Sequence, residues 1–140
     1  MDSSPLVSEQ IEVGARFLRE FAKYRPVQSA FWYKDSDQGE WHLYVASDQV
    51  TDDNFDVVYE EVGQVGEQMD DPWFDVFQVK VIGTDHPLAR AAQDLQRRYP
   101  GRVPGRFPSK AFGAGNGGDV YLYAVPLPAP TPGGSPSAAN

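Results

Sequence analysis

The fold of this 140-residue chain is decided by residues 29–47, which have the sequence SAFWYKDSDQGEWHLYVAS. Aromatic and β-branched residues stand on both sides of the polar segment 35–39, a pattern that predicts two strands joined by a hairpin turn. If the turn pairs Lys34 with Glu40, alternate residues divide between two faces. One face carries Phe31, Tyr33, Trp41, Leu43 and Val45, and the other carries Trp32, Lys34, Glu40, His42 and Tyr44. We expect the first face to be core. A register shifted by one residue would keep the alternation within each strand and change the cross-strand partners.

Three segments have the apolar spacing of amphipathic helices. Ser8, ahead of Glu9 and Glu12, predicts a helix start. Pro26 requires this helix to end near Tyr24 or Arg25. Its apolar side carries Ile11, Gly14, Ala15, Phe17, Leu18, Phe21 and Ala22. The second helix follows residues 51–53 and ends before Asp71, with a stripe of Phe55, Val58, Tyr59, Val62, Val65, Gly66 and Met69. The third follows the turn at 83–87 and buries Leu88, Ala91, Ala92, Leu95 and Tyr99.

The remaining strands complete a mixed sheet. Residues 74–82 alternate as a strand, with Phe77, Val79 and Val81 on one face. Residues 106–112 and 119–125 predict a last hairpin around the glycine-rich loop 113–118. The order helix, strand, strand, helix, strand, helix, strand, strand predicts an α+β fold, a two-layer α/β sandwich. It would have a mixed sheet of about five strands with three helices on one side.

The chain length suits one domain with a core of its own. We expect a flexible N-terminus over residues 1–7, a single globular domain over 8–125, and a disordered tail rich in Pro, Gly and Ser over 126–140. The chain has no Cys, no apolar run near the ~20 residues of a membrane span, and no signal-like N-terminus. These features predict a cytoplasmic, bacterial-type protein without a cofactor.

Charge is distributed unevenly along the chain. The net charge is −8, with 20 acidic and 12 basic residues, which argues against nucleic acid and membranes as partners. Residues 1–75 hold 17 acidic and 5 basic residues, whereas residues 76–140 hold 3 acidic and 7 basic ones. We expect the basic end to fold beside the acidic end. A fully exposed basic surface would instead reopen the question of nucleic acid.

An uncovered sheet face would be unusually aromatic. If all helices cover one side, the other side presents Trp32, His42, Tyr44, Gln78, Lys80, Tyr121 and Tyr123. Amphipathic aromatic residues mixed with polar groups are typical of recognition surfaces. The first hypothesis is therefore a small non-enzymatic protein-binding module with an accessory, antitoxin-like or immunity-like role. Its aromatic face would provide affinity, and its acidic second helix would steer a basic partner. The sequence also leaves open that two copies of the chain form a homodimer.

The alternative hypothesis is a small enzyme or a domain that binds an anionic ligand. Asp85 and His86 stand at a predicted helix N-terminus after a strand, where a His can act as acid or base. Arg102, Arg106 and Lys110 would surround the anion. The same Asp and His also fit a plain helix cap.

Two weaker patterns predict no site. Loop 113–118 lacks the Lys and Ser or Thr of a phosphate-binding loop and precedes a strand. Asp52, Asp56 and Glu60 recur every four residues, as solvent-facing helix carboxylates do, and we predict no metal.

Overall fold

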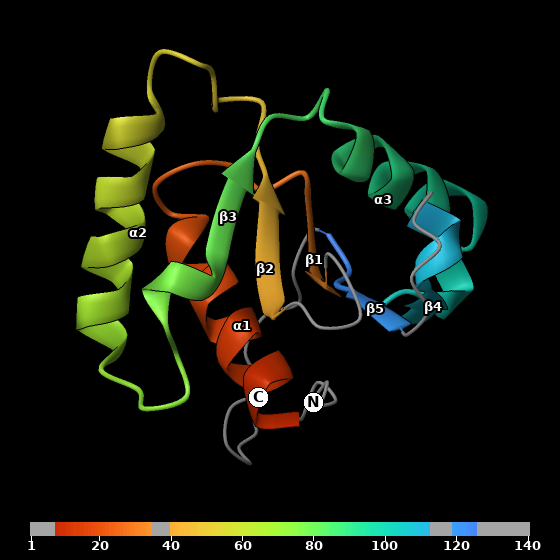
Figure 1. The fold of residues 1–140 in the computed structure, drawn as a ribbon, viewed down its shortest axis with the longest axis horizontal. Helices are drawn as coiled ribbons and strands as arrows, with labels where there is room; N and C mark the ends of the chain where they lie inside the picture. The colour runs from red at the N-terminus through yellow and green to blue at the C-terminus, as the bar shows by residue number, and fades with distance from the viewer. Residues whose placement is uncertain (1–7, 35–39, 113–118, 126–140) are drawn as a thin grey trace, which may run out of the picture.

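The computed structural model describes residues 8–34, 40–112 and 119–125 of the chain. The predicted N-terminus 1–7, hairpin turn 35–39, glycine-rich loop 113–118 and tail 126–140 lie outside the described residues. The helices are α1 (Ser8–Phe21), α2 (Phe55–Met69) and α3 (Pro87–Arg98), and the strands are β1 (Ser29–Lys34), β2 (Trp41–Ala46), β3 (Val79–Ile82), β4 (Gly105–Pro108) and β5 (Asp119–Leu122) (Figure 1). Three short 3₁₀ turns are η1 (Val76–Gln78), η2 (Pro100–Arg102) and η3 (Ser109–Phe112).

The five strands form one sheet in the order β3-β2-β1-β5-β4. The β2–β3 pair is parallel, and the β1–β2, β1–β5 and β4–β5 pairs are antiparallel. The α+β class, the mixed five-stranded sheet, the three helices and the approximate order of the elements are therefore confirmed.

The register of the first hairpin differs by one residue from the expected one. Lys34 lies opposite Trp41 rather than Glu40, and Trp32 lies opposite Leu43. Glu40 precedes β2, so the connection between the two strands is one residue longer than predicted. Because side chains alternate with a period of two, this shift puts Trp32 on the face of Trp41 and Leu43. Phe31 moves to the face of Tyr44, opposite which it stands.

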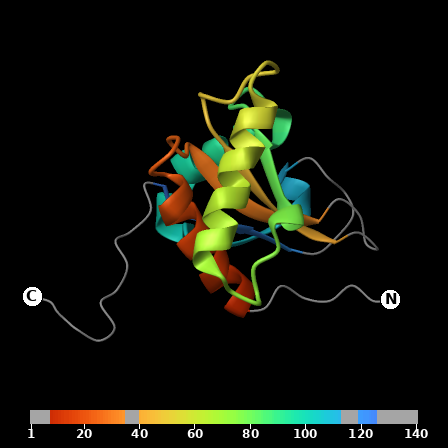
Figure 2. The ribbon, with the colours of Figure 1, turned by 90° about the vertical axis from the view of Figure 1, so that its left-hand side faces the viewer.

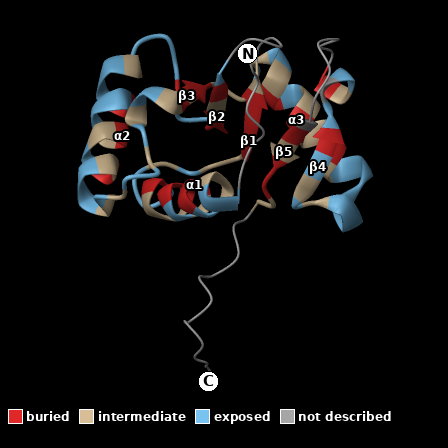
Figure 3. Cartoon of the chain, turned by 60° about the horizontal axis from the view of Figure 1, so that its bottom comes forward, coloured by how far each residue is buried: buried red, intermediate tan, exposed pale blue. Residues whose placement is uncertain are grey.

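Helices cover both faces of the sheet, which corrects the expectation that all three lie on one side. α1 and α2 lie side by side over one face, as Figure 2 shows, and pack on Trp32, Leu43 and Val45. α3 covers the other face, where Ala89, Ala92 and Leu95 join the cluster of Phe31 and Tyr44. Figure 3 shows the buried residues along the strands between these layers. The third layer forms because both faces of β1 are apolar and each needs a cover.

The predicted strand over residues 74–82 begins only at Val79. The side chain of Asp75 accepts a hydrogen bond from the backbone N–H of Phe77 (2.9 Å), which closes η1. The turn directs Val76 onto α2, where an added Cβ at Gly66 would lie 2.5 Å from Val76 Cγ1. Phe77, predicted to share a face with Val79 and Val81, is consequently 88% exposed.

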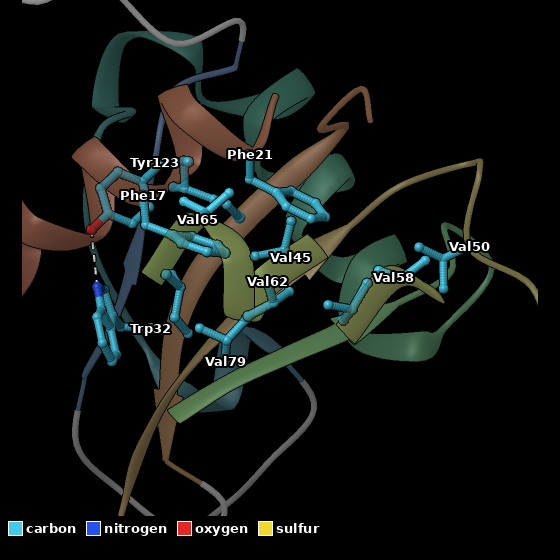
Figure 4. Packing of buried hydrophobic residues seen from close by; sticks show 14 of the residues in the cluster. Phe17, Phe21, Trp32, Val45, Val50, Val58, Val62, Val65, Val79 and Tyr123 are labelled. Atoms are coloured by element: carbon cyan, nitrogen blue, oxygen red, sulfur yellow. Dashed lines mark hydrogen bonds between the residues drawn. The ribbon is translucent and has the colours of Figure 1, made fainter. Parts of the chain in front are cut away.

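One hydrogen-bonded chain joins α1 to the middle of the sheet. The Tyr123 hydroxyl accepts from Trp32 Nε1 at 2.9 Å, the bond drawn in Figure 4. It donates to the carbonyl of Ile11 at 2.6 Å. Gly14 of α1 stands against this pair. A Cβ atom at Gly14 would collide with the Tyr123 hydroxyl and lie 3.0 Å from Trp32 Nε1. The absence of a side chain at Gly14 therefore allows α1 to approach the sheet.

A pair of glycine substitutions tests this packing. Gly14→Ala should lower the free energy of unfolding by about 1–3 kcal/mol, because the added methyl overpacks the contact. Gly63→Ala is the matched control, since a Cβ at Gly63 of α2 meets nothing within 4 Å. Helix propensity alone should raise stability there by about 0.5–1 kcal/mol. Urea unfolding of both variants measures the effects, and stabilisation by Gly14→Ala would contradict the close contact.

Candidate functional site

The predicted open aromatic face is not a surface. Trp32, Tyr44 and Tyr123 are only 3%, 5% and 3% exposed. His42, Lys80 and Tyr121 are intermediate in exposure. The expectation of an open face is therefore wrong, because α3 covers Tyr44 and α1 covers Trp32 and Tyr123.

The six residues also divide between the two sides of the sheet. Trp32 and Tyr121 are cross-strand partners on the α1 side, where Tyr123 also lies. Tyr44 and Lys80 are partners on the α3 side, with Lys80 Nζ 5.6 Å from the centre of the Tyr44 ring. His42 alternates in phase with Tyr44 and shares that side. These side chains therefore do not form one platform.

Burial also suppresses the ionisation of the two tyrosines on the α1 side. Desolvation raises the pKa of Tyr123 well above its ordinary value, and its hydrogen bond from Trp32 opposes this only in part. Desolvation likewise raises the pKa of Tyr121, with Arg106 acting in the other direction. Both phenols are therefore neutral at physiological pH, and that of Tyr123 is a hydrogen-bonding group of the fold.

The residues of the alternative site are not assembled around one ligand. His86 caps α3, its Nδ1 accepting from the backbone N–H of Leu88 at 3.1 Å, and Asp85 next to it is exposed. Arg102 lies beyond the opposite end of α3, a helix of 12 residues or ~18 Å. Arg106 and Lys110 belong to β4 and η3. The cap interpretation of His86 therefore agrees with its geometry.

A different region carries unneutralised charge. No Lys or Arg occurs between Lys34 and Lys80. Within that span, Asp71 pairs with Arg16 (2.6 Å) and Glu61 pairs with Arg25 (2.6 Å). Seven other carboxylates of α2 and its flanks have no ion-pair partner among the described residues: Asp52, Asp53, Asp56, Glu60, Glu67, Asp70 and Asp75. This part of the molecule is thus a strongly negative surface.

Exposed apolar side chains gather in the same region. Six large apolar residues of the described chain are exposed, and four of them, Val57, Tyr59, Trp73 and Phe77, belong to α2 or the segment after it. Phe77 is the extreme case, and Trp73 is 52% exposed. Single exposed apolar residues are ordinary on protein surfaces, but aromatic residues grouped among charges are typical of interaction sites.

Two contacts join α2 to the segment that carries Phe77 and to β3. Gly66 of α2 packs against Val76, the neighbour of Phe77. About two turns earlier in α2 and on the same side of the helix, the Tyr59 hydroxyl accepts from the backbone N–H of Val81 in β3 (2.9 Å). Tyr59 and Phe77 therefore lie along the same seam between α2 and β3. We define the acidic surface by Asp56, Tyr59, Glu60, Glu67, Asp70, Trp73, Asp75 and Phe77.

A groove borders the acidic surface between α1 and α2. It has a volume of about 420 Å³ and is lined by Arg16, Arg19, Glu20, Gln68 and Met69. Arg16 is held by Asp71, and Glu20 is held by Lys23 at 3.0 Å. Because Asp71 pairs with Arg16 and Glu20 lines the groove, the charge of its two arginines is offset in part.

Trp73 and Phe77 were not among the residues that the sequence indicated as a site. Two signals pointed to them: the long span without Lys or Arg, and the turn-forming residues Pro72 and Asp75, which interrupt the alternation expected of a strand. The acidic second helix was correctly expected to carry carboxylates on its outer side, and Figure 3 shows that side exposed.

Comparison of the chain with models of known protein families, with curated protein sequences and with solved structures found no match. In the described part of the chain, no helix combines the length and apolar character needed to cross a membrane. Residues 8–34, 40–112 and 119–125 contain no group of three His, Asp or Glu side chains placed to hold a metal ion.

The contrast between Trp32 and Phe77 tests which aromatic residues are core. Trp32→Ala should lower the free energy of unfolding by about 3–5 kcal/mol, because it empties a buried site. Phe77→Ala should change it by no more than about 0.5 kcal/mol, because the ring is exposed. Thermal and urea unfolding measure both variants. A stable Trp32→Ala protein would mean that the register places Trp32 outside the core.

Alkaline titration tests the burial of Tyr123. Its folded-state pKa is raised, so its contribution to stability is complete below the unfolded-state value of about 10 and is lost as pH rises above it. The free energy of unfolding should therefore fall above about pH 10. Tyr123→Phe should reduce that fall. It should also lower the free energy of unfolding by about 1–3 kcal/mol at neutral pH, because the indole N–H of Trp32 and the carbonyl of Ile11 would lose their hydrogen-bond partner. An unchanged alkaline slope would contradict the assignment.

Proposed function

We propose that this protein is a non-enzymatic protein-binding module that recognises a basic partner through the acidic surface. The observation that carries the proposal is the exposure of Phe77 among carboxylates that have no ion-pair partner in the described residues. A ring left in water beside unneutralised charge is suited to a partner that supplies both apolar contact and cations.

The two kinds of side chain would contribute differently to binding. Burial of Phe77 and Trp73 would provide most of the affinity, as aromatic anchors do in protein interfaces. The carboxylates of α2 would accelerate the encounter with a positive partner and reject negative ones. Arg or Lys of the partner can also bind the face of an aromatic ring, which adds about 0.5–2 kcal/mol per contact.

This chemistry fits an accessory, antitoxin-like or immunity-like role, in which a small acidic protein covers a basic surface of its partner. In this proposal the protein acts in the cytoplasm. The aromatic sheet face has no part in the proposed contact, because Trp32 and Tyr44 are core residues.

Binding of a labelled amphipathic peptide rich in Lys and Leu tests the proposal. Phe77→Ala should weaken binding by about 1–4 kcal/mol, which is about fivefold to nearly 1,000-fold, without changing the melting temperature. Glu60→Gln combined with Glu67→Gln should slow association and flatten its dependence on salt. Fluorescence anisotropy and stopped-flow mixing measure the affinity and the rate.

Matched variants separate a specific surface from net charge. Glu40→Gln combined with Asp85→Asn removes two exposed carboxylates outside the acidic surface. Tyr99→Ala removes a partly exposed ring far from α2. Both controls should bind the peptide as the wild-type protein does. If Phe77→Ala binds equally well, or the controls weaken binding as much as the test variants, the acidic surface is not the site.

A further inference from the structure

The basic residues gather at the end of the molecule opposite the acidic surface. Exposed cations lie on α3, η2, β4 and η3: Arg90, Arg97, Arg98, Arg102, Arg106 and Lys110. Figure 1 shows α2 and these elements at opposite sides of the sheet. The expectation that the basic end folds beside the acidic end is therefore wrong. Asp94 pairs with Arg97 and Arg98 of its own helix, whereas Arg16 and Arg25 pair within the acidic half.

The separation of the two ends prevents them from neutralising each other within one molecule. The acidic surface adjoins β3, and the basic end adjoins β4, the two outer strands of the sheet. Four strand spacings of ~4.8 Å put these strands ~19 Å apart. That distance exceeds two Debye lengths of ~8 Å at physiological ionic strength. Each end therefore presents its charge to solvent.

The guanidinium group of Arg102 is stacked on two aromatic rings, in a position suited to an anionic partner. Its guanidinium carbon lies 4.8 Å from the centre of the Phe107 ring and 5.7 Å from that of Tyr99. Gly105 makes room for the Arg102 carbonyl, against which any Cβ would collide. Arg102 has no acidic partner among the described residues, and neither has Lys110. A cation fixed by stacking loses little freedom on binding.

We infer that a second copy of this chain is a partner of the acidic surface. The basic end, which we define by Arg98, Tyr99, Arg102, Arg106 and Lys110, docks on the carboxylates and exposed rings of the next copy. This inference rests on the proposed function, because it assigns an occupant to the same surface. Charge complementarity carries it: each copy displays one end of each sign, and the rings of Phe77 and Trp73 can receive guanidinium groups.

A contact between two different ends joins molecules head to tail. Every added copy leaves one free end of each sign, so assembly continues unless the ends close a ring or an antiparallel pair. The mass of the assembly should rise with protein concentration. It should fall with salt, because both ends are exposed and their attraction is screened.

Light scattering coupled to size-exclusion chromatography tests the inference. In about 0.1 M salt the wild-type mass should exceed 15.5 kDa and rise with concentration, and in about 1 M salt it should return to that of one chain. Glu60→Lys with Glu67→Lys disables the acidic surface. Arg102→Glu with Lys110→Glu disables the basic end, and Arg102→Gln with Lys110→Gln is a milder form. Each variant alone should have the mass of one chain.

Mixing the two disabled variants gives the decisive result. For the mixture, neutral substitutions disable the ends, Glu60→Gln with Glu67→Gln in one variant and Arg102→Gln with Lys110→Gln in the other, because reversed charges on both would attract each other. Each variant keeps the end that the other lacks, so an equimolar mixture should form a dimer of twice the single-chain mass and stop there. Recovery of the dimer also shows that both variants are folded. Glu40→Lys and Lys23→Glu, which change exposed charges outside both ends, should associate as the wild-type protein does.

Three results would overturn the inference. They are a wild-type mass of one chain at all concentrations, association that persists in about 1 M salt, and a mixture that stays monomeric. If the wild type is monomeric but binds a labelled single-stranded oligonucleotide, and Arg102→Glu with Lys110→Glu abolishes that binding, the basic end recognises nucleic acid instead. A monomeric protein that still binds the basic peptide at Phe77 would retain the proposed function and lose only self-association.

Discussion

The hydrogen bonds of the Tyr123 hydroxyl are the interaction on which the arrangement of this fold depends. They join the β1 side chain of Trp32, the residue that directly follows β5 and the backbone of α1 at Ile11. The contact is possible only where α1 comes close to the sheet, and Gly14 provides the room. Since α2 packs on α1 through the same core cluster, the position of the acidic surface follows from this contact.

The two covered faces restrict where the protein can meet a partner. With α1 and α2 on one face and α3 on the other, the sheet itself is unavailable for recognition. Its β3 edge is also occupied, because Tyr59 accepts from Val81 and the N–H of Val79 is bonded to Val76. The surfaces that remain accessible to a partner at this edge are the outer side of α2 and the turn that carries Phe77. Because both faces of the sheet are covered, the exposed ring of Phe77 lies at the β3 edge.

The topology also separates the charges. The acidic segment ends at β3 and the basic segment includes β4, and the strand order puts these two strands at opposite edges. Ion pairs then form within each half of the sequence, as between Arg25 and Glu61 or between Arg98 and Asp94. Net charge alone describes this molecule poorly, because it carries a negative surface and a positive end. These lie farther apart than the distance over which charges attract each other at physiological ionic strength.

The amino-acid sequence by itself determined the helices, the hairpin and the mixed sheet, because each rests on local periodicity and turn residues. Phe17, Leu18 and Val62 are core residues, as their spacing predicts. Only the tertiary structure decided the hairpin register, the side that α3 covers and the exposure of Phe77. A period of two cannot tell which of two apolar faces is covered, since Phe31 and Trp32 are equally suited to burial. The candidate site was half predicted for the same reason: the acidic helix is a local pattern, whereas the place of each aromatic ring depends on what packs against it.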